Sequence, residues 1–298
     1  LGTGFTRLGT FLPGYRPSGP APLCLPALQS LCACIPPPAF YRLGQAPSGL
    51  GSGRCKCVAS RSPAPGQTGT PTAAMLRRPI ARYRAHVRRE LGRMLPDVRR
   101  LREAAAAGDL AAARAAWLRA DARYETIGAA YGAFGRLDDA INGTPAGLPG
   151  GPRSPRFAGL HRVELALWGR RSTTDAVQPA RRLYRAVARL RAHVRRAVID
   201  PLDYSLRAHE VLEDSLHLQL AGRASPWASA ALPALAANVD GTRVVLRTVR
   251  AVIDQRNPQV GRDARRSLDR VDGVLEQLGP RNLAVFCNVA RNQKRHLV

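Results

Sequence analysis

The sequence predicts an all-α protein, and three observations support that prediction. From Pro79 onward, apolar residues recur at three- and four-residue spacing, which is the pattern of amphipathic helices. Hydrophobic residues make up 45% of the chain and aromatic residues only 5%, and much of the apolar content is Ala, Leu and Val, which suits packed helices. No segment alternates with period two for long enough to predict a strand.

Residues 1–74 differ from the rest of the chain. They are rich in Pro, Gly and Ser and show no helical periodicity. Such a composition buries too little apolar surface to offset the entropy of ordering, so we expect a disordered extension. Because the chain begins with Leu1 and Met75 precedes the first helical pattern, we also expect that the extension is translated from upstream sequence that is not normally expressed. No signal peptide or lipobox is recognisable in it.

Cysteines are concentrated in the same extension, which contains five of the six. The pairs Cys32/Cys34 and Cys55/Cys57 are C-x-C motifs and lack the C-x2-C spacing of common zinc modules. The predicted helical body contains none, so any metal site there must use oxygen and nitrogen ligands.

The helical body is expected to span residues 75–278. Gly108-Asp109 ends the first helix and caps the second, because glycine favours helix C-termini and aspartate favours N-caps. A Gly- and Pro-rich loop is expected over 143–155. Gly279-Pro280 predicts the end of the last helix, followed by an irregular tail over 279–298. After the first helix, further helices are predicted at about 109–134, 157–168, 175–199, 202–220, 227–254 and 258–278.

The formal net charge of +25 raises the possibility of nucleic-acid binding. Arginines could form a basic stripe on the first helix, at Arg78, Arg82, Arg89, Arg93 and Arg100. A solvated helix face explains such a stripe better, because no recognition motif or aromatic stacking platform accompanies it. A basic nucleic-acid-binding helical protein is therefore kept only as an alternative.

The segment Gly159 to Glu164 is the most informative for function. Its His161 and Glu164 are three residues apart, so on a helix they share one face and can converge on one ion. Helical bundles build metal sites from such pairs together with carboxylates on neighbouring helices. Taken alone, this spacing more often marks a solvated His–Glu pair than a metal site. Candidate supporting carboxylates are Glu125, Glu210 and Glu213, each of which taken singly also fits a surface acid.

Several segments, taken in order, resemble signature blocks of the imelysin/EfeO family of iron-uptake proteins. These segments are Tyr124 to Gly128, Phe134 to Asp138, and Phe157 to Glu164 followed by Leu167-Trp168. Arg207 to Glu213 and Asn238 to Thr242 resemble further blocks, so the resemblance covers about residues 78–278.

The resemblance implies a fold of paired helical bundles with the H-x-x-E helix lining the cleft between them. It also implies an extracytoplasmic iron-binding component of an EfeUOB-type system, working beside a membrane iron permease and a haem peroxidase-like protein. Carried over by position, His161 and Glu164 would be the motif ligands, and Glu125 with either Glu210 or Glu213 would be the supporting carboxylates. Iron, as Fe2+ or Fe3+, is the implied metal; the same ligand types also suit Zn or Mn.

The chain departs from the family pattern at three points. Gly128 stands where many members have a second glutamate, and Asn142 stands where an acid is common. The family usually continues for about two helices beyond Leu278, so a fold truncated at the C-terminus is expected. The cupredoxin domain of some members is also missing, which favours the shorter EfeM-like arrangement.

An enzyme is the remaining alternative, because imelysins were classed as peptidases. A metal-dependent peptidase-like hydrolase would be expected to carry H-E-x-x-H, with two histidines four residues apart, and His161 has no such partner in its helix. We therefore expect no enzymatic activity.

Overall fold

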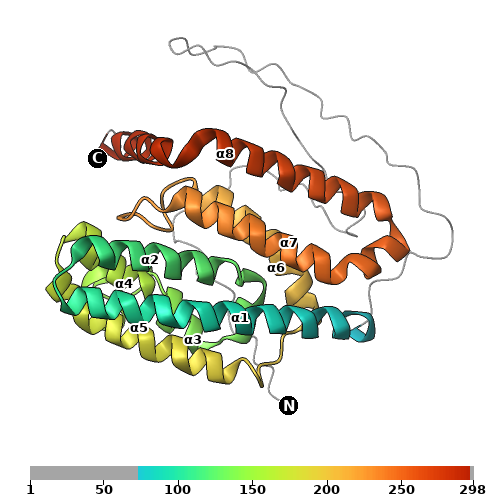
Figure 1. The fold of residues 1–298 in the computed structure, drawn as a ribbon, viewed down its shortest axis with the longest axis horizontal. Coiled ribbons are helices and arrows are strands. Elements are labelled where there is room, and N and C mark those ends of the chain that lie inside the picture. The colour runs from blue at the N-terminus through green and yellow to red at the C-terminus, as the bar shows by residue number, and fades with distance from the viewer. Residues whose placement is uncertain (1–72, 296–298) are drawn as a thin grey trace, which may run out of the picture. The chain divides into compact units, whose positions relative to one another are not determined.

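The computed structural model describes residues 73–295, with side chains described over residues 73–278. Over this range the elements are helices joined by turns and loops, so the predicted all-α class is confirmed (Figure 1). The expectation of disorder for residues 1–74 falls outside the described residues, apart from Ala73 and Ala74, which already belong to the first helix. None of the described helices combines the length and the apolar character needed to cross a membrane.

Three long helices form one side of the described body. Helix α1 (Ala73–Ala106) packs against both α2 (Leu110–Glu125) and α5 (Thr173–His193), as Figure 1 shows. Their shared core is apolar and fully buried, and includes Leu91, Trp117 and Leu183. The boundary between α1 and α2 is the predicted one, because Gly108 has a φ of 79° and the Asp109 side chain accepts from the Ala112 N–H at 2.9 Å.

A second group of helices follows, made of α6 (Pro201–Asp214), α7 (Ala231–Arg256) and α8 (Pro258–Arg295). Helix α7 is the central member, because it contacts α1, α2, α6 and α8. It approaches the end of α2 very closely at Gly241, where an added Cβ would lie 2.7 Å from the Thr126 carbonyl oxygen. Only glycine fits this contact, so the position of α7 against the end of α2 depends on it.

Several predicted helices are divided in the structure. The helix predicted at 109–134 ends at Glu125, and a 3-10 turn (Gly128–Ala133) and α3 (Arg136–Asn142) follow it. A short 3-10 turn also spans Gly151–Arg153. The helix predicted at 157–168 is α4 (Leu160–Glu164) followed by a π-helical turn (Leu165–Gly169), and a second π-helical turn (Ser215–Gln219) follows α6. π-helical turns occur often at functional sites, and both of these adjoin the candidate site.

The predicted helix end at Gly279-Pro280 is wrong, since α8 continues to Arg295. A proline removes one backbone hydrogen bond and crowds the preceding turn, but a helix can pass through it. Helix α1 does so at Pro79 and Pro96, and α5 does so at Pro179.

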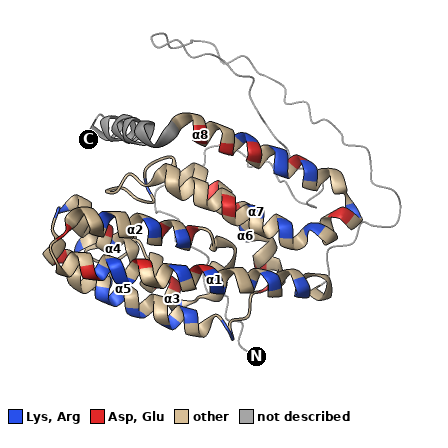
Figure 2. Cartoon of the chain, in the orientation of Figure 1, with Lys and Arg blue, Asp and Glu red and all other residues tan. Residues whose placement is uncertain are grey.

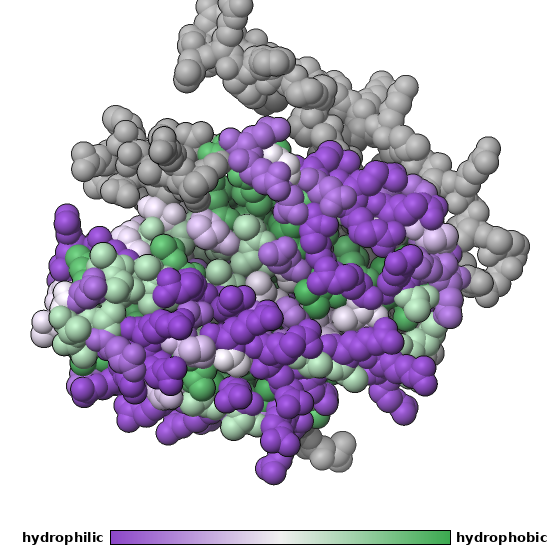
Figure 3. Space-filling model, viewed as in Figure 1, coloured by the Kyte–Doolittle hydropathy of each residue, from purple (hydrophilic) through white to green (hydrophobic). Residues whose placement is uncertain are grey.

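Charge is spread over the described helices with both signs interspersed (Figure 2). Two arginines of the predicted basic stripe are already paired, Arg93 with Glu90 at 2.8 Å and Arg100 with Asp97 at 3.4 Å. These contacts reduce the free positive charge of that stripe. On the face seen in Figure 3, hydrophilic residues predominate, and apolar residues reach the surface beside α7 and α8.

Candidate metal centre

The His161–Glu164 pair lies at the start of a short buried helix. Gly159 precedes α4 with a φ of 83°, and an added Cβ there would overlap the Ile141 carbonyl oxygen, so this position requires glycine. The side chains of His161 and Glu164 are 7% and 0% exposed, and His161 Nδ1 lies 2.9 Å from Glu164 Oε2. The three-residue spacing thus places both groups on the inner face of α4.

The second oxygen of Glu164 holds the chain just before α7. Glu164 Oε1 accepts from the backbone N–H groups of Trp227 at 2.8 Å and Ala228 at 2.7 Å. Hydrogen bonds to an ionised carboxylate are stronger than bonds between neutral groups. We call these two bonds the amide clasp; they tie α4 to a segment more than sixty residues away in sequence.

Glu125, the last residue of α2, belongs to a polar network with the second group of helices. Its Oε2 accepts from Gln219 Nε2 and from Asn238 Nδ2, each at 2.9 Å. Asn238 is 2% exposed, and its Nδ2 also lies 3.1 Å from Ser215 Oγ and 3.0 Å from Gln219 Oε1. The network therefore fixes Glu125 between the π-helical turn after α6 and the helix α7.

Electrostatics link Glu125 to the His161–Glu164 pair. Burial raises the pKa of Glu125, while hydrogen bonds from Asn238 and Gln219 and the nearby His161 imidazole act to lower it. Burial raises the pKa of Asp121 well above its ordinary value, and the charges of Glu125 and Glu164 raise it further. Four ionisable side chains from α2 and α4 therefore influence one another in this region.

Asp121 was missed in the sequence, although helical spacing points to it. It is four residues before Glu125 and therefore lies on the same face of α2. The same face contacts α4 and the π-helical turn after it, because Trp117 Nε1 donates to the Leu160 carbonyl at 2.9 Å and Arg114 donates to the Leu167 carbonyl at 2.6 Å. Gln219 and Asn238 were also missed as site residues, because no local pattern distinguishes a network amide from an ordinary one.

The structure does not bring Glu210 and Glu213 to the buried pair. Their side chains are 45% and 56% exposed, and they lie near Arg207 and His209 of their own helix, at 3.8 and 3.4 Å. The reason is the rotation of α6. Val211 packs on Gly128, where an added Cβ would lie 2.6 Å from Val211 Cγ2.

Asp214 is the carboxylate of α6 that influences Glu125 instead, since its charge raises the pKa of Glu125. Ser215, four residues after Val211, is 1% exposed and continues the inward face of α6. Glu213 is two residues from Val211 and two from Ser215, and therefore projects to the opposite side of the helix. The sequence did not reveal this rotation because α6 has polar residues on more than one face.

In the described part of the chain, no three His, Cys, Asp and Glu side chains lie close enough together to hold an ion in their present conformations. The amide clasp directs one oxygen of Glu164 to the backbone, and hydrogen bonds from amide side chains occupy one oxygen of Glu125. The available donors are carboxylate oxygens and an imidazole nitrogen, a set that suits iron, manganese and zinc. Binding an ion would require rotation of these side chains.

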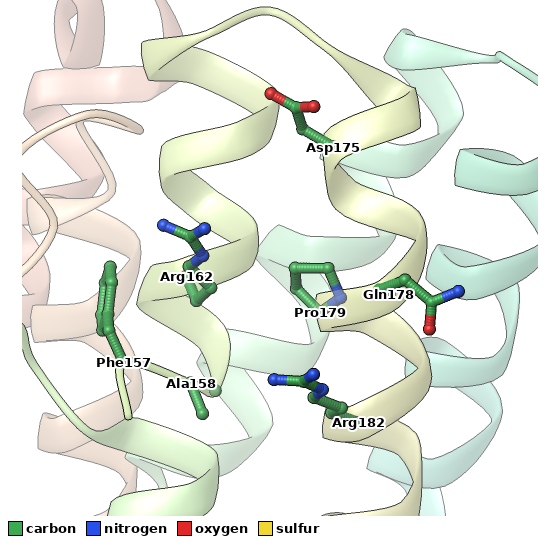
Figure 4. Close-up of a pocket in the computed structure, with 8 residues that line it drawn as sticks. Phe157, Ala158, Arg162, Asp175, Gln178, Pro179 and Arg182 are labelled. Atoms are coloured by element: carbon green, nitrogen blue, oxygen red, sulfur yellow. The ribbon is translucent and has the colours of Figure 1, made fainter. Parts of the chain in front are cut away.

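Arg162, between the two motif residues, lies on the other side of α4. It lines a surface pocket of about 210 Å³ together with Phe157, Asp175 and Arg182, among others (Figure 4). Its Nη1 donates to the Pro152 carbonyl at 2.8 Å, and its guanidinium lies 5.7 Å from the centre of the Phe157 ring. Helix α4 therefore directs the His161 imidazole and the Glu164 carboxylate inward and the Arg162 guanidinium outward.

His86 lies beside the end of α2 and gives a prediction for acid stability. Its Nε2 lies 3.3 Å from the Thr126 carbonyl oxygen, and burial is the main cause of a lowered pKa. A histidine with a lowered folded-state pKa contributes stability above its unfolded pKa of about 6.5, and that stability is lost as the pH falls toward the folded value.

We therefore expect His86→Gln to lose less unfolding free energy than the wild type between pH 7.5 and 5. Urea unfolding in the presence of a chelator measures this, with His193→Gln, at an exposed position, as the control. Equal pH dependence in the wild type and His86→Gln would contradict the assignment.

Comparison with known proteins agrees with this fold. Residues 79–207 match the imelysin family, which is also described as peptidase family M75. The "Iron uptake system component EfeO" of Yersinia pseudotuberculosis is 26% identical over 205 residues, which covers 69% of this chain and 55% of the relative. The EfeO of Escherichia coli K12 is 26% identical over 196 residues, covering 66% of this chain and 52% of the relative. The chain thus spans about half the length of the curated relatives that it matches.

The described residues form an all-helical body in which Asp121 and Glu125 of α2 and the His161–Glu164 pair of α4 influence one another electrostatically. In this arrangement and in its matched segment 79–207, the chain is similar to the imelysin family and to EfeO proteins.

Proposed function

We propose that this imelysin-like protein binds a metal ion through His161, Glu164 and Glu125. One observation supports this most strongly. The buried acids of α1 are neutralised by arginines: Glu90 pairs with Arg93 and Arg123, and Asp97 pairs in the same way with two others. Among the ion pairs of the described residues, Asp121, Glu125 and Glu164 have no such arginine partner. Buried carboxylates without a counter-charge are costly, and a bound cation removes that cost.

Iron is the proposed ion because the relatives are named iron uptake system components. In the same proposal, the protein acts outside the cytoplasm as the metal-binding component of an EfeUOB-type system, beside a membrane iron permease and a haem peroxidase-like protein. Zn and Mn remain possible ions for the same ligands. The relatives' names describe uptake components and not enzymes, which favours a binding role over hydrolysis.

Titration of the full chain with Mn²⁺ tests the metal site. Mn²⁺ avoids the affinity of zinc for thiolates, and its electron paramagnetic resonance signal reports the free ion directly. We expect His161→Ala to weaken Mn²⁺ binding by about 10- to 100-fold, since it removes a nitrogen ligand and the partner of Glu164. His193→Ala, at an exposed position on α5, serves as the matched control and is expected to bind like the wild type. Equal affinity of His161→Ala and wild type would refute the proposed site.

A further inference from the structure

We propose that Asp121 is a third buried carboxylate of the metal site and that its charge makes the site prefer a trivalent cation over a divalent one. This inference rests on the proposed metal-binding function. It adds a residue that the H-x-x-E pattern does not indicate, and it gives the charge class of the ion.

The placement of Asp121 follows from the packing of α2 on α4. Trp117 Nε1 donates to the carbonyl of Leu160, the residue immediately before His161. Asp121 is four residues after Trp117 and four before Glu125, so all three share one face of α2. Side chains four residues apart on a helix have Cβ atoms about 5–6 Å apart. The face that touches the start of α4 therefore continues through Asp121 to Glu125.

Asp121 is buried without an arginine partner. It is 3% exposed, and the charged groups that act on its carboxyl group are Glu125 and Glu164, with no arginine among them. Asp97 of α1 provides the comparison, because it is similarly buried at 5% but contacts Arg100 at 3.4 Å and Arg119 at 3.1 Å. A carboxylate that is buried as deeply as Asp97 but lacks its arginines is suited to a cation that arrives from outside the protein.

A second polar atom supports a ligand at this place. Asn238 is 2% exposed, and its Oδ1 has no hydrogen-bond partner, although its Nδ2 donates to Glu125 Oε2 at 2.9 Å. Buried polar atoms are nearly always hydrogen-bonded, so the unpartnered oxygen of a side chain whose nitrogen already binds Glu125 indicates a missing donor or ion. An amide oxygen can coordinate a hard cation without changing the charge of the site.

The charge preference follows from counting the acidic side chains. Burial favours the protonated forms of Asp121 and Glu125 in the metal-free protein, and a bound ion would displace those protons. With all three carboxyl groups ionised around the ion and a neutral imidazole, Asp121, Glu125 and Glu164 give the site a charge of −3, which a trivalent ion balances. A divalent ion leaves one negative charge buried and uncompensated, which is unfavourable. Because Coulomb energy scales with the ion's charge, removal of one carboxylate weakens the binding of a trivalent ion more than the binding of a divalent ion at the same position.

The test compares Ga³⁺, a redox-inert trivalent ion supplied as its nitrilotriacetate complex, with Mn²⁺. Both affinities are measured on the full chain by equilibrium dialysis with elemental analysis. For Asp121→Asn we expect the ratio of Ga³⁺ to Mn²⁺ affinity to fall by about 10-fold or more, and the Ga³⁺ affinity itself by about 100-fold. Asp121→Glu retains the charge and is expected to keep the ratio within about threefold of the wild type.

Asp97→Asn is the matched control, because it makes the same chemical change at another buried acid. It is expected to leave the ratio unchanged. The proposal is overturned if Asp121→Asn lowers both affinities equally or leaves both unchanged, if Asp97→Asn shifts the ratio as strongly, or if Asp121→Glu behaves like Asp121→Asn. In each of these cases, a loss of Mn²⁺ binding in His161→Ala would still support the proposed metal site. The role of Asp121 can therefore be refuted without refuting the metal site.

Discussion

Glu164→Ala is expected to lower the unfolding free energy of the metal-free protein by about 3 kcal/mol or more, and also to abolish metal binding. The substitution removes the acceptor of the Trp227 and Ala228 N–H groups and the partner of His161. A buried donor left without an acceptor costs about 1–3 kcal/mol, and here two backbone donors are affected together. Urea unfolding with a chelator present measures the stability, and Mn²⁺ titration measures the binding.

Two variants separate these effects. Glu164→Gln keeps an acceptor oxygen for the amide clasp, so it is expected to retain more stability than Glu164→Ala. Its metal binding is nevertheless expected to be weak, because the carboxylate charge is lost. Glu103→Ala removes an acid whose side chain is 57% exposed, and it is expected to change stability by less than about 0.5 kcal/mol. If Glu164→Ala unfolds at the same urea concentration as the wild type, the amide clasp does not stabilise the fold.

Gly159→Ala is expected to destabilise the protein by about 3 kcal/mol and to weaken metal binding, because it displaces the start of α4. Two penalties combine at this position. Gly159 has a φ of 83° and a ψ of −162°, a backbone region essentially restricted to glycine, where another residue costs about 1–3 kcal/mol, and the new methyl group would also overlap the Ile141 carbonyl oxygen. Denaturant unfolding gives the stability, and Mn²⁺ titration reports whether His161 and Glu164 remain in place.

Gly108→Ala is the matched control for this prediction. Gly108 has a φ of 79°, close to the 83° of Gly159, but an added Cβ there meets nothing within 4 Å. It should therefore cost only about 1–2 kcal/mol, from the backbone penalty alone. Equal losses for the two variants would show that neither the contact with Ile141 nor the ψ of −162° at Gly159 adds to the cost.

The sequence predicted the features that depend on local periodicity. The burial of Tyr83, Val87 and Leu91, the boundary at Gly108-Asp109 and the shared face of His161 and Glu164 all follow from residue spacing within one helix. Such patterns are set by helix geometry and need no knowledge of the neighbours.

Features set by tertiary contacts were not predictable in this way. The rotation of α6 is fixed at the contact of Val211 with Gly128, and α7 meets the end of α2 at Gly241; both contacts join residues far apart in sequence. That rotation decides that Glu213 is exposed and that Ser215 is buried. Asp121 is the exception, because its four-residue spacing from Glu125 was visible in the sequence and was overlooked.

The amide clasp has a consequence for how tightly an ion can be kept. Glu164 Oε1 is already engaged by two N–H groups, so an incoming ion competes with the backbone for the same carboxylate. The measured free energy of ion binding is then the free energy gained from the ion's contacts with the carboxylate minus the free energy lost when those two hydrogen bonds are weakened. Under the proposed metal-binding function, such a competitor within the protein is expected to weaken retention of the ion.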